Sequence, residues 1–181
     1  MLWCYNAGMK RLLVVVDYQN DFISGSLGFE GADAIEDNIV NLIKEFEASG
    51  DDIVFTFDCH DKDYMNTVEG KNLPVIHCIK GTEGYELSDK VKPMLKNYPT
   101  FPKPGFGSLE LGEYIKSKDY NEIYLCGLVS DICVFSNAII AKSAASTKTE
   151  IIICKDATSS FDLNMQEKSF DVLRHLHIQI K

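Results

Sequence analysis

Long apolar runs and basic residues are both scarce in this 181-residue sequence. No stretch approaches the roughly 18 apolar residues that a membrane-spanning helix needs, and the opening MLWCYNAGMKR has neither a long apolar core nor a small-residue cleavage site. Lysine and arginine number 18 against 27 aspartates and glutamates, a formal net charge of −9 at pH 7. So acidic a chain is poorly suited to nucleic acid or to an anionic membrane surface, and we expect neither as a partner.

Several common catalytic and binding patterns are also missing. The six cysteines, at positions 4, 59, 78, 126, 133 and 154, form no CxxC pair and no evenly spaced framework. Their arrangement favours a reduced, cytoplasmic protein in which most thiols are packing residues. The sequence has no GxSxG, which excludes the usual serine-hydrolase elbow, and neither GSLG nor GTEG opens a helix directly after a strand as a nucleotide-binding loop does.

The remaining composition is that of one globular domain. Hydrophobic residues make up 45% and charged residues 25% of the chain, which are ordinary values, and 181 residues can bury a substantial core. Met9 stands directly before the first apolar run, like a second translation start. We therefore expect residues 1–8 to be an N-terminal extension and residues 9–181 to form a single domain.

Apolar runs of strand length alternate with segments of helical periodicity. Continuous apolar runs predict buried strands, and apolar residues at three- and four-residue spacing predict helices. The predicted strands are 11–17, 52–60, 122–128, 149–157 and 177–180. The predicted helices are 34–50, 86–97, 108–118, 131–146 and 162–176. This order implies a Rossmann-like α/β fold: an open, mostly parallel sheet with helices on both faces, in three α/β/α layers.

Reactive side chains stand at the ends of three predicted strands. Asp17 ends the first strand, Asp58 lies near the end of the second, and the turn 129–133 follows the third. Open α/β sheets bind ligands outside the carboxyl ends of their strands, so these groups can meet at one edge. A single aspartate at such a position is as often a turn or helix cap, and the coincidence of three strand ends is what indicates a site.

Cys133 is expected in the first turn of the helix that follows the third of these strands. Unpaired backbone N–H groups and the positive end of the helix dipole favour a thiolate there, and they can receive an oxyanion. Alternatively, the cysteine packs as a small hydrophobe, which is our interpretation of mid-strand Cys126. A nucleophilic thiol also needs a proton acceptor, and Asp17 is a candidate if its pKa is raised by burial or by the thiolate.

Lys103 occurs in the unusual segment FPKPGFGS, residues 101–108. Prolines flank the lysine, two glycines follow it, and Phe101 and Phe106 bracket it. Such a rigid apolar loop can hold an ammonium group out of water beside a carboxylate and a thiolate. Most lysines are solvated surface residues, and that alternative stays open on these residues alone.

Three ordered motifs carry a family resemblance: VVVDYQNDF, FPKPGFGS and GLVSDICV. In this order and spacing they resemble the isochorismatase-like cysteine hydrolases, the family that contains nicotinamidases. The resemblance implies a catalytic triad of Asp17, Lys103 and Cys133 on a parallel sheet flanked by helices. It also implies a non-proline cis peptide between Leu128 and Val129, and an oxyanion hole made of the backbone N–H groups of Val129 and Cys133.

A second constellation lies in FDCHDKDYMNTVEGKNLPVIHC, residues 57–78. Side chains alternate along a strand, so Asp58 and His60 point the same way, and His77 ends a loop long enough to fold back to them. One carboxylate and two imidazoles suit a divalent metal, with zinc first and iron or manganese as alternatives. Equally, Asp58 can cap a turn while each histidine bonds a backbone carbonyl. Nicotinamidases use a similar ligand set, and the resemblance adds Glu69 as a fourth candidate ligand.

The sequence departs from the nicotinamidase pattern around the expected substrate. Where those enzymes usually carry a tryptophan shortly before the last metal histidine, this chain has Leu73 or Pro74. Ile132 precedes the candidate nucleophile, at a position that is often aromatic in the family. Phe22 matches the family's phenylalanine after QND and supplies one aromatic wall. We predict that Phe22 and Leu73 contact the substrate.

Together the motifs predict a metal-assisted cysteine amidohydrolase that cleaves a small carboxamide through a thioester on Cys133. Nicotinamide is the leading substrate, and an N-carbamoyl compound or another small amide is the alternative within the family. Two further alternatives fit the sequence less well. A vinyl-ether hydrolase of the isochorismatase type would lack the nucleophilic cysteine, and a non-catalytic metal- or thiol-binding protein would not need the triad. We expect a homo-oligomer, and the sequence does not indicate the number of subunits.

Overall fold

Parallel strands form the centre of the computed structural model, which describes residues 9–181. In sheet order they are β3 (Thr100–Lys103), β2 (Asp52–Asp58), β1 (Arg11–Val16), β4 (Glu122–Leu128), β5 (Glu150–Ser159) and β6 (Gln179–Ile180). Every neighbouring pair is parallel. The expected extension 1–8 lies outside the described residues. The predicted open α/β sheet is confirmed, with the short β6 at one edge.

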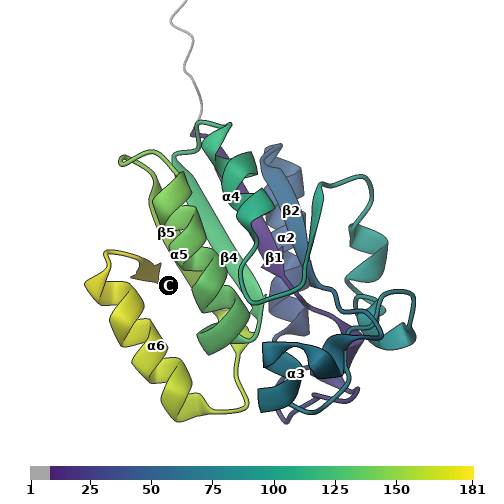
Figure 1. Ribbon diagram of the computed structural model, residues 1–181. Helices are drawn as coiled ribbons and strands as arrows, with labels where there is room; N and C mark the ends of the chain where they lie inside the picture. The colour runs from purple at the N-terminus through teal and green to yellow at the C-terminus, as the bar shows by residue number, and fades with distance from the viewer. Residues whose placement is uncertain (1–8) are drawn as a thin grey trace, which may run out of the picture.

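Helices cover both faces of this sheet, which gives the predicted three layers (Figure 1). One face packs against α2 (Glu36–Ser49), and the other against α4 (Leu109–Lys116), α5 (Phe135–Ala144) and α6 (Leu163–His175). Successive side chains of β1 divide between the two faces, because a strand points them alternately to either side. Leu13 joins the apolar cluster under α2, and its neighbours join the cluster under the other three helices. A strand covered on both faces needs this uninterrupted apolar sequence.

The helix α2 forms for the reasons that its sequence suggests. Ile39, Ile43 and Phe46 recur at helical spacing, and all three are buried on the sheet. The helix ends at Gly50, whose φ of 72° is the left-handed conformation that glycine adopts without strain. Within residues 9–181, no helix combines the length and the apolar content needed to cross a bilayer.

The helix predicted over 86–97 is wrong. Only a short 3-10 turn, Lys92–Met94, interrupts an otherwise irregular chain there. Pro93 explains the difference, because it has no N–H to donate and its ring clashes with the preceding helical turn. The apolar spacing that suggested a helix instead buries Leu87 and Val91 in the cluster under α2.

The strand β3 occupies a segment that was predicted to be irregular. It has four residues with alternate side chains buried, so that Phe101 and Lys103 point inward. Pro102 is tolerated because β3 is an edge strand that pairs with β2 alone. This pairing sets Lys103 opposite Asp58. Short helices also occur where none was predicted: α1 (Asn20–Ile23), α3 (Val68–Asn72) and the 3-10 turns Tyr64–Asn66 and Glu83–Tyr85.

Candidate active site

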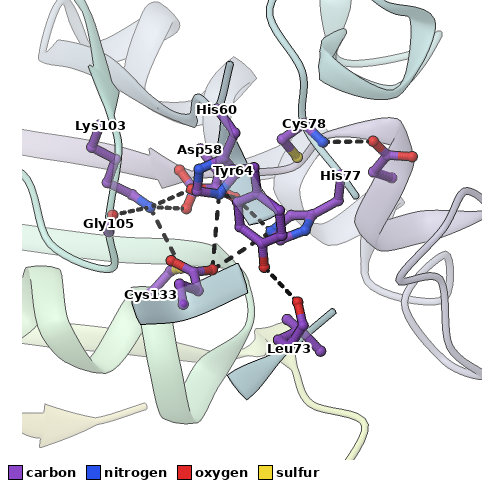
Figure 2. A network of polar contacts seen from close by, with 12 residues as sticks. Asp58, His60, Tyr64, Leu73, His77, Cys78, Lys103, Gly105 and Cys133 are labelled. Carbon is purple, nitrogen blue, oxygen red and sulfur yellow. Dashed lines mark hydrogen bonds and ion pairs between the residues drawn. The ribbon is translucent and has the colours of Figure 1, made fainter. Parts of the chain in front are cut away.

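Four neighbouring parallel strands end at one edge of the sheet, and a reactive group follows or closes each of them. β3 ends with Lys103, β2 ends with Asp58, β1 is followed by Asp17, and β4 leads into the turn that contains Cys133. Parallel strands bring their carboxyl ends to the same edge, as expected for a ligand site of an open sheet. Figure 2 shows Lys103, Asp58 and Cys133 close together at this edge.

Lys103 lies at the centre of this group. Its Nζ is 2.6 Å from Asp17 Oδ2, as an ion pair rather than an aligned hydrogen bond, and it donates hydrogen bonds to Cys133 Sγ at 3.5 Å and Gly105 O at 3.0 Å. The other Asp17 oxygen accepts a hydrogen bond from Thr56 Oγ1 at 2.6 Å. The side chains of Lys103 and Asp17 are 1% and 0% exposed. This excludes the alternative of a solvated surface lysine.

Burial and the mutual charges of these groups set their protonation. Burial raises the pKa of the Cys133 thiol well above its usual range. The Lys103 charge lowers this pKa, and the Asp17 charge raises it further. Burial also raises the pKa of Asp17, against the effect of Lys103. For Lys103 burial alone would lower the pKa, but the facing Asp17 and Cys133 raise it above its usual range. Burial therefore opposes the thiolate that the helix start was expected to favour, and the Lys103 ammonium supports it.

Asp58, His60 and His77 form a second group beside the first. Their candidate ligand atoms all lie within 4.8 Å of one another, and all three residues are buried. Nε2 of His60 and Nε2 of His77 lie 3.1 and 3.2 Å from Asp58 Oδ2, and Glu69 Oε1 lies 3.8 and 3.7 Å from the same two nitrogens. Figure 2 shows the two imidazoles beside Asp58.

The hydrogen bonds of the two histidines fit a metal site. His77 Nδ1 lies 2.8 Å from Val75 O, and a proton held there leaves a lone pair on Nε2, which faces Asp58. His60 Nε2 is buried without an aligned hydrogen-bond partner although Asp58 is near. The alternative was that each imidazole only bonds a backbone carbonyl. In the structure a carbonyl faces His77 Nδ1, and that alternative does not account for His77 Nε2 or His60 Nε2. A divalent cation would satisfy the nitrogen that His60 leaves without a partner.

Negative charge is concentrated around this second group. Burial opposes ionisation of Asp58, but His60, His77 and Lys103 together hold its pKa below the usual range. The pKa of Glu69 is raised by burial and by the nearby Asp58 carboxylate. Two carboxylates so close to two imidazoles create a potential that favours a bound cation.

A cavity of about 360 Å³ opens beside both groups. Cys133, Asp58, His77 and Glu69 line it, together with mostly apolar side chains. The apolar part comprises Phe22, Leu27, Phe29, Leu73, Phe106, Val129, Ile132 and Phe161. Neither lysine nor arginine is among the residues that line the cavity in the described part of the chain. The structure thus joins a thiol and a candidate metal site to a pocket whose other walls are mostly apolar and aromatic.

Residues 11–180 match the family model described as the isochorismatase domain. The chain belongs to the isochorismatase family. It is 33% identical over 166 residues to PncA of Bacillus subtilis (strain 168), an uncharacterized isochorismatase family protein, covering 85% of this chain and 88% of that one. It is 28% identical over 185 residues to a nicotinamidase of Acinetobacter baylyi, covering 84% of this chain and 82% of the relative. The resemblance predicted from the three motifs is confirmed.

Solved structures of the isochorismatase family share the whole architecture. The crystal structure of nicotinamidase PncA from Bacillus subtilis superposes with a TM-score of 0.83 at 32% identity, covering 95% of this chain and 99% of that chain. Near-complete coverage in both directions means that the sheet and the loops at its edge have counterparts in that enzyme.

The turn that carries Cys133 differs from the regular helix start that was expected. The Leu128–Val129 peptide is cis, as the resemblance implies, and a π-helical turn, Ser130–Val134, precedes α5. No side chain caps the turn; the Ser130 hydroxyl instead donates a hydrogen bond to Gln166 Oε1 on α6 at 2.8 Å. The turn places Cys133 Sγ at the cavity and against Lys103, while the oxyanion hole stays a prediction.

Two residues of the first motif, which sequence reasoning left without a role, hold the backbone of the second group. The Gln19 amide accepts a hydrogen bond from Asp58 N at 2.8 Å and donates to Asp58 O at 2.9 Å. Asp21 Oδ2 accepts a hydrogen bond from Cys78 N at 2.7 Å, next to His77. Between β1 and these residues Asp17 has a φ of 45°, which turns the chain sharply. The polar residues that follow the apolar run of this motif were the available signal.

Asn137 on α5 holds the first group together, a role that no sequence pattern indicated. Its Nδ2 donates to Cys133 O at 2.9 Å and to Phe106 O at 3.2 Å, and its Oδ1 accepts a hydrogen bond from Ser108 N at 3.0 Å. One buried amide thus ties the cysteine turn to the loop that follows Lys103. An isolated asparagine in a helix does not reveal such a contact, because its partners come from another segment.

Tyr64 is a further residue that no motif indicated. Its ring centroid lies 4.6 Å from that of His60 and 5.0 Å from that of His77, and its hydroxyl donates to Leu73 O at 2.8 Å (Figure 2). The ring therefore packs on both candidate ligands. Its hydroxyl fixes the segment from which Leu73 lines the cavity.

Proposed function

We propose that this isochorismatase-family protein hydrolyses a small neutral carboxamide through a covalent thioester on Cys133, with nicotinamide as the leading substrate. The observation that carries the proposal is the buried Lys103, whose Nζ contacts both Asp17 Oδ2 and Cys133 Sγ beside a cavity. A buried acid, ammonium and thiol in mutual contact are costly to maintain for packing alone, and they suit nucleophilic catalysis.

The reaction follows from the protonation of these groups. Asp17 accepts the thiol proton, and Lys103 offsets the negative charge that develops on the sulfur as that proton leaves. Cys133 Sγ forms a bond to the amide carbon, and the charge passes to the amide oxygen. The backbone N–H groups of Val129 and Cys133 are proposed to receive the oxyanion. Asp17 returns its proton to the leaving nitrogen, so that ammonia departs and a thioester remains. Water attacks the thioester while Asp17 takes a proton from it, and the acid and the thiol are regenerated.

Asp58, His60 and His77 are proposed to hold a divalent metal ion, zinc first and iron or manganese as alternatives, with Glu69 as a fourth ligand. A bound ion would supply an open coordination position for a polar atom of the substrate, such as a ring nitrogen. The chain's own part is to orient the imidazoles: Val75 O fixes the His77 tautomer, and the Tyr64 ring packs on both.

The lining of the cavity favours a neutral ring over an N-carbamoyl amino acid. A substrate carboxylate needs a cationic partner, and the lining offers Asp58 and Glu69 but, over the described residues, no lysine or arginine. Phe22 and Leu73 both line the cavity, and Phe22 meets the His77 ring edge-on at 5.7 Å. These apolar surfaces suit a planar aromatic ring, which supports nicotinamide ahead of aliphatic amides. The homo-oligomer and the cytoplasmic location stay predictions.

The test is ammonia release from a panel of nicotinamide, pyrazinamide, benzamide, an aliphatic amide and an N-carbamoyl amino acid. We expect the pyridine and pyrazine carboxamides to be turned over fastest. Cys133→Ala should release no measurable ammonia. Cys126→Ala should stay active, because Cys126 is buried within β4 and does not line the cavity. Release by Cys133→Ala, or none from any amide with wild-type protein, contradicts the proposal.

A further inference from the structure

The cavity is larger than the proposed substrate requires. A dry protein cavity of about 150 Å³ accommodates benzene, which has six non-hydrogen atoms, so each such atom needs about 25 Å³. On that scale the about nine such atoms of nicotinamide need about 225 Å³. The cavity offers about 360 Å³. The remaining space is close to that of one more six-membered ring.

This surplus space has an aromatic boundary at the outer end of the cavity. At the inner end Cys133 is 5% exposed, whereas Phe106 and Phe161 are 48% and 64% exposed and yet line the same cavity. Phe29 meets Phe161 edge-to-face, with ring centroids 6.2 Å apart and planes at 76°. Exposure therefore rises from the thiol to a mouth bordered by phenylalanines.

The three phenylalanines reach this mouth from separate parts of the chain. Phe29 lies between α1 and α2, Phe106 between β3 and α4, and Phe161 between β5 and α6. A single exposed phenylalanine needs no explanation, but three that converge on one opening form an apolar surface of the kind that binds ligands.

We propose that Phe29, Phe106 and Phe161 form a second, aromatic subsite, which binds an uncharged apolar substituent carried by the carboxamide ring. The substrate class is then an aryl carboxamide extended by a hydrophobic ring or chain. The subsite is uncharged, because the acidic side chains of the lining belong to the inner group and no cationic side chain of the described residues joins it. The amide chemistry rests on the proposed function, whereas the subsite rests on the cavity and its rings.

The kinetic test compares nicotinamide with its phenyl-substituted positional isomers. At least one isomer should exceed nicotinamide in kcat/KM by about 10- to 100-fold, mainly through KM, because a second ring leaves water. Phe161→Ala should lower the ratio of the two kcat/KM values about tenfold. Leu163→Ala is the matched control, because Leu163 is equally exposed at 64%, lies two residues away and does not line the cavity. It should keep the ratio. If no isomer exceeds nicotinamide, or Phe161→Ala leaves the ratio unchanged, the subsite is wrong.

A binding measurement separates this proposal from the proposed function. Calorimetry with Cys133→Ala protein should show at least one phenyl isomer binding about tenfold or more tightly than nicotinamide, with a more negative heat-capacity change. The gain should disappear in Cys133→Ala/Phe161→Ala. If the gain is found but wild-type protein releases no ammonia, the subsite stands and the amidase proposal fails. If no isomer gains affinity, the subsite fails whatever the turnover.

Discussion

The two polar groups at the sheet edge differ in how their charges are balanced. In the first group the Lys103 ammonium lies between the Asp17 carboxylate and the Cys133 thiol, and Thr56 satisfies the remaining Asp17 oxygen. In the second, the carboxylates of Asp58 and Glu69 lie near His60 Nε2, which has no aligned hydrogen-bond partner. Lys103 reaches this second group only at 3.7 Å from Asp58 Oδ1.

This difference indicates what each group still needs. The first is internally compensated, so its stability and its chemistry depend on the chain alone. The second has an excess of donor atoms and negative charge, so its completion depends on a cation from solution. Substitutions in the first should therefore affect folding and catalysis directly, whereas substitutions in the second should act through metal affinity.

The largest effect is expected when Lys103 is removed. Lys103→Met should lower the free energy of unfolding by about 3–5 kcal/mol, because the buried Asp17 carboxylate loses its partner. Its kcat should fall by about 10² or more, as for other charge-stabilising groups. Urea unfolding and steady-state kinetics measure the two effects.

The double variant Asp17→Asn/Lys103→Met provides the control for this experiment. Neutralising both partners removes the uncompensated charge, so most of the stability should return while activity does not. Near-normal kcat in Lys103→Met would make the lysine a bystander, and His60 and His77 would again become candidates for the proton acceptor.

Zinc should distinguish the second group from the first. At 100-fold excess over its dissociation constant, zinc should stabilise wild-type protein by about 2.7 kcal/mol, measured as a shift in the urea midpoint. Lys103→Met should keep this gain, because the variant retains Asp58, His60 and His77, and the cation that it removes beside Asp58 is not a metal ligand. His77→Ala should lose it. An equal zinc gain in His77→Ala and wild-type protein would mean that the ion binds elsewhere.

A smaller effect is expected from the two buried amides that support the groups. Gln19→Leu should weaken zinc binding about 10- to 100-fold, as loss of other supporting hydrogen bonds near metals does. Asn137→Leu should leave zinc affinity unchanged and lower kcat about tenfold or more through misplacement of Cys133 against Lys103. Chelator competition and kinetics on the same two proteins provide mutual controls. If each variant changes both zinc affinity and kcat, the two groups are structurally coupled and do not act independently.

Much of the fold and of the site was accessible from the sequence because it depends on local patterns. The uninterrupted apolar runs of β1 and β4 reveal strands buried on both faces, and their ends marked Asp17 and the cysteine turn. The alternation of Asp58 and His60 along the strand predicted over 52–60 indicated that both side chains point to one side, and they lie together beside His77.

The remainder depends on long-range contacts that no local pattern encodes. β3 contains a proline and only four residues, and it is a strand because an edge position beside β2 accepts it. The roles of Gln19 and Asn137 arise from backbone atoms of distant segments. The helix-start argument for a thiolate took no account of burial, which raises the pKa of the Cys133 thiol. Local chemistry predicted the reactive groups, and packing shifts their pKa values.

The last prediction uses pH to measure the compensation within the first group. Because burial raises the pKa of the Cys133 thiol, its alkylation by iodoacetamide should accelerate as pH rises from 7 to 9, with the thiolate fraction growing about tenfold per unit below the pKa. The Asp17 charge raises this pKa and the Lys103 charge lowers it. Asp17→Asn should therefore move the alkylation profile to lower pH, and Lys103→Met should move it to higher pH. Mass spectrometry of the labelled Cys133 peptide gives the rates, with the Cys126 peptide as an internal control. A profile that is flat from pH 7 would mean a thiolate at rest, and shifts of the same sign in both variants would mean that neither charge acts directly on the sulfur.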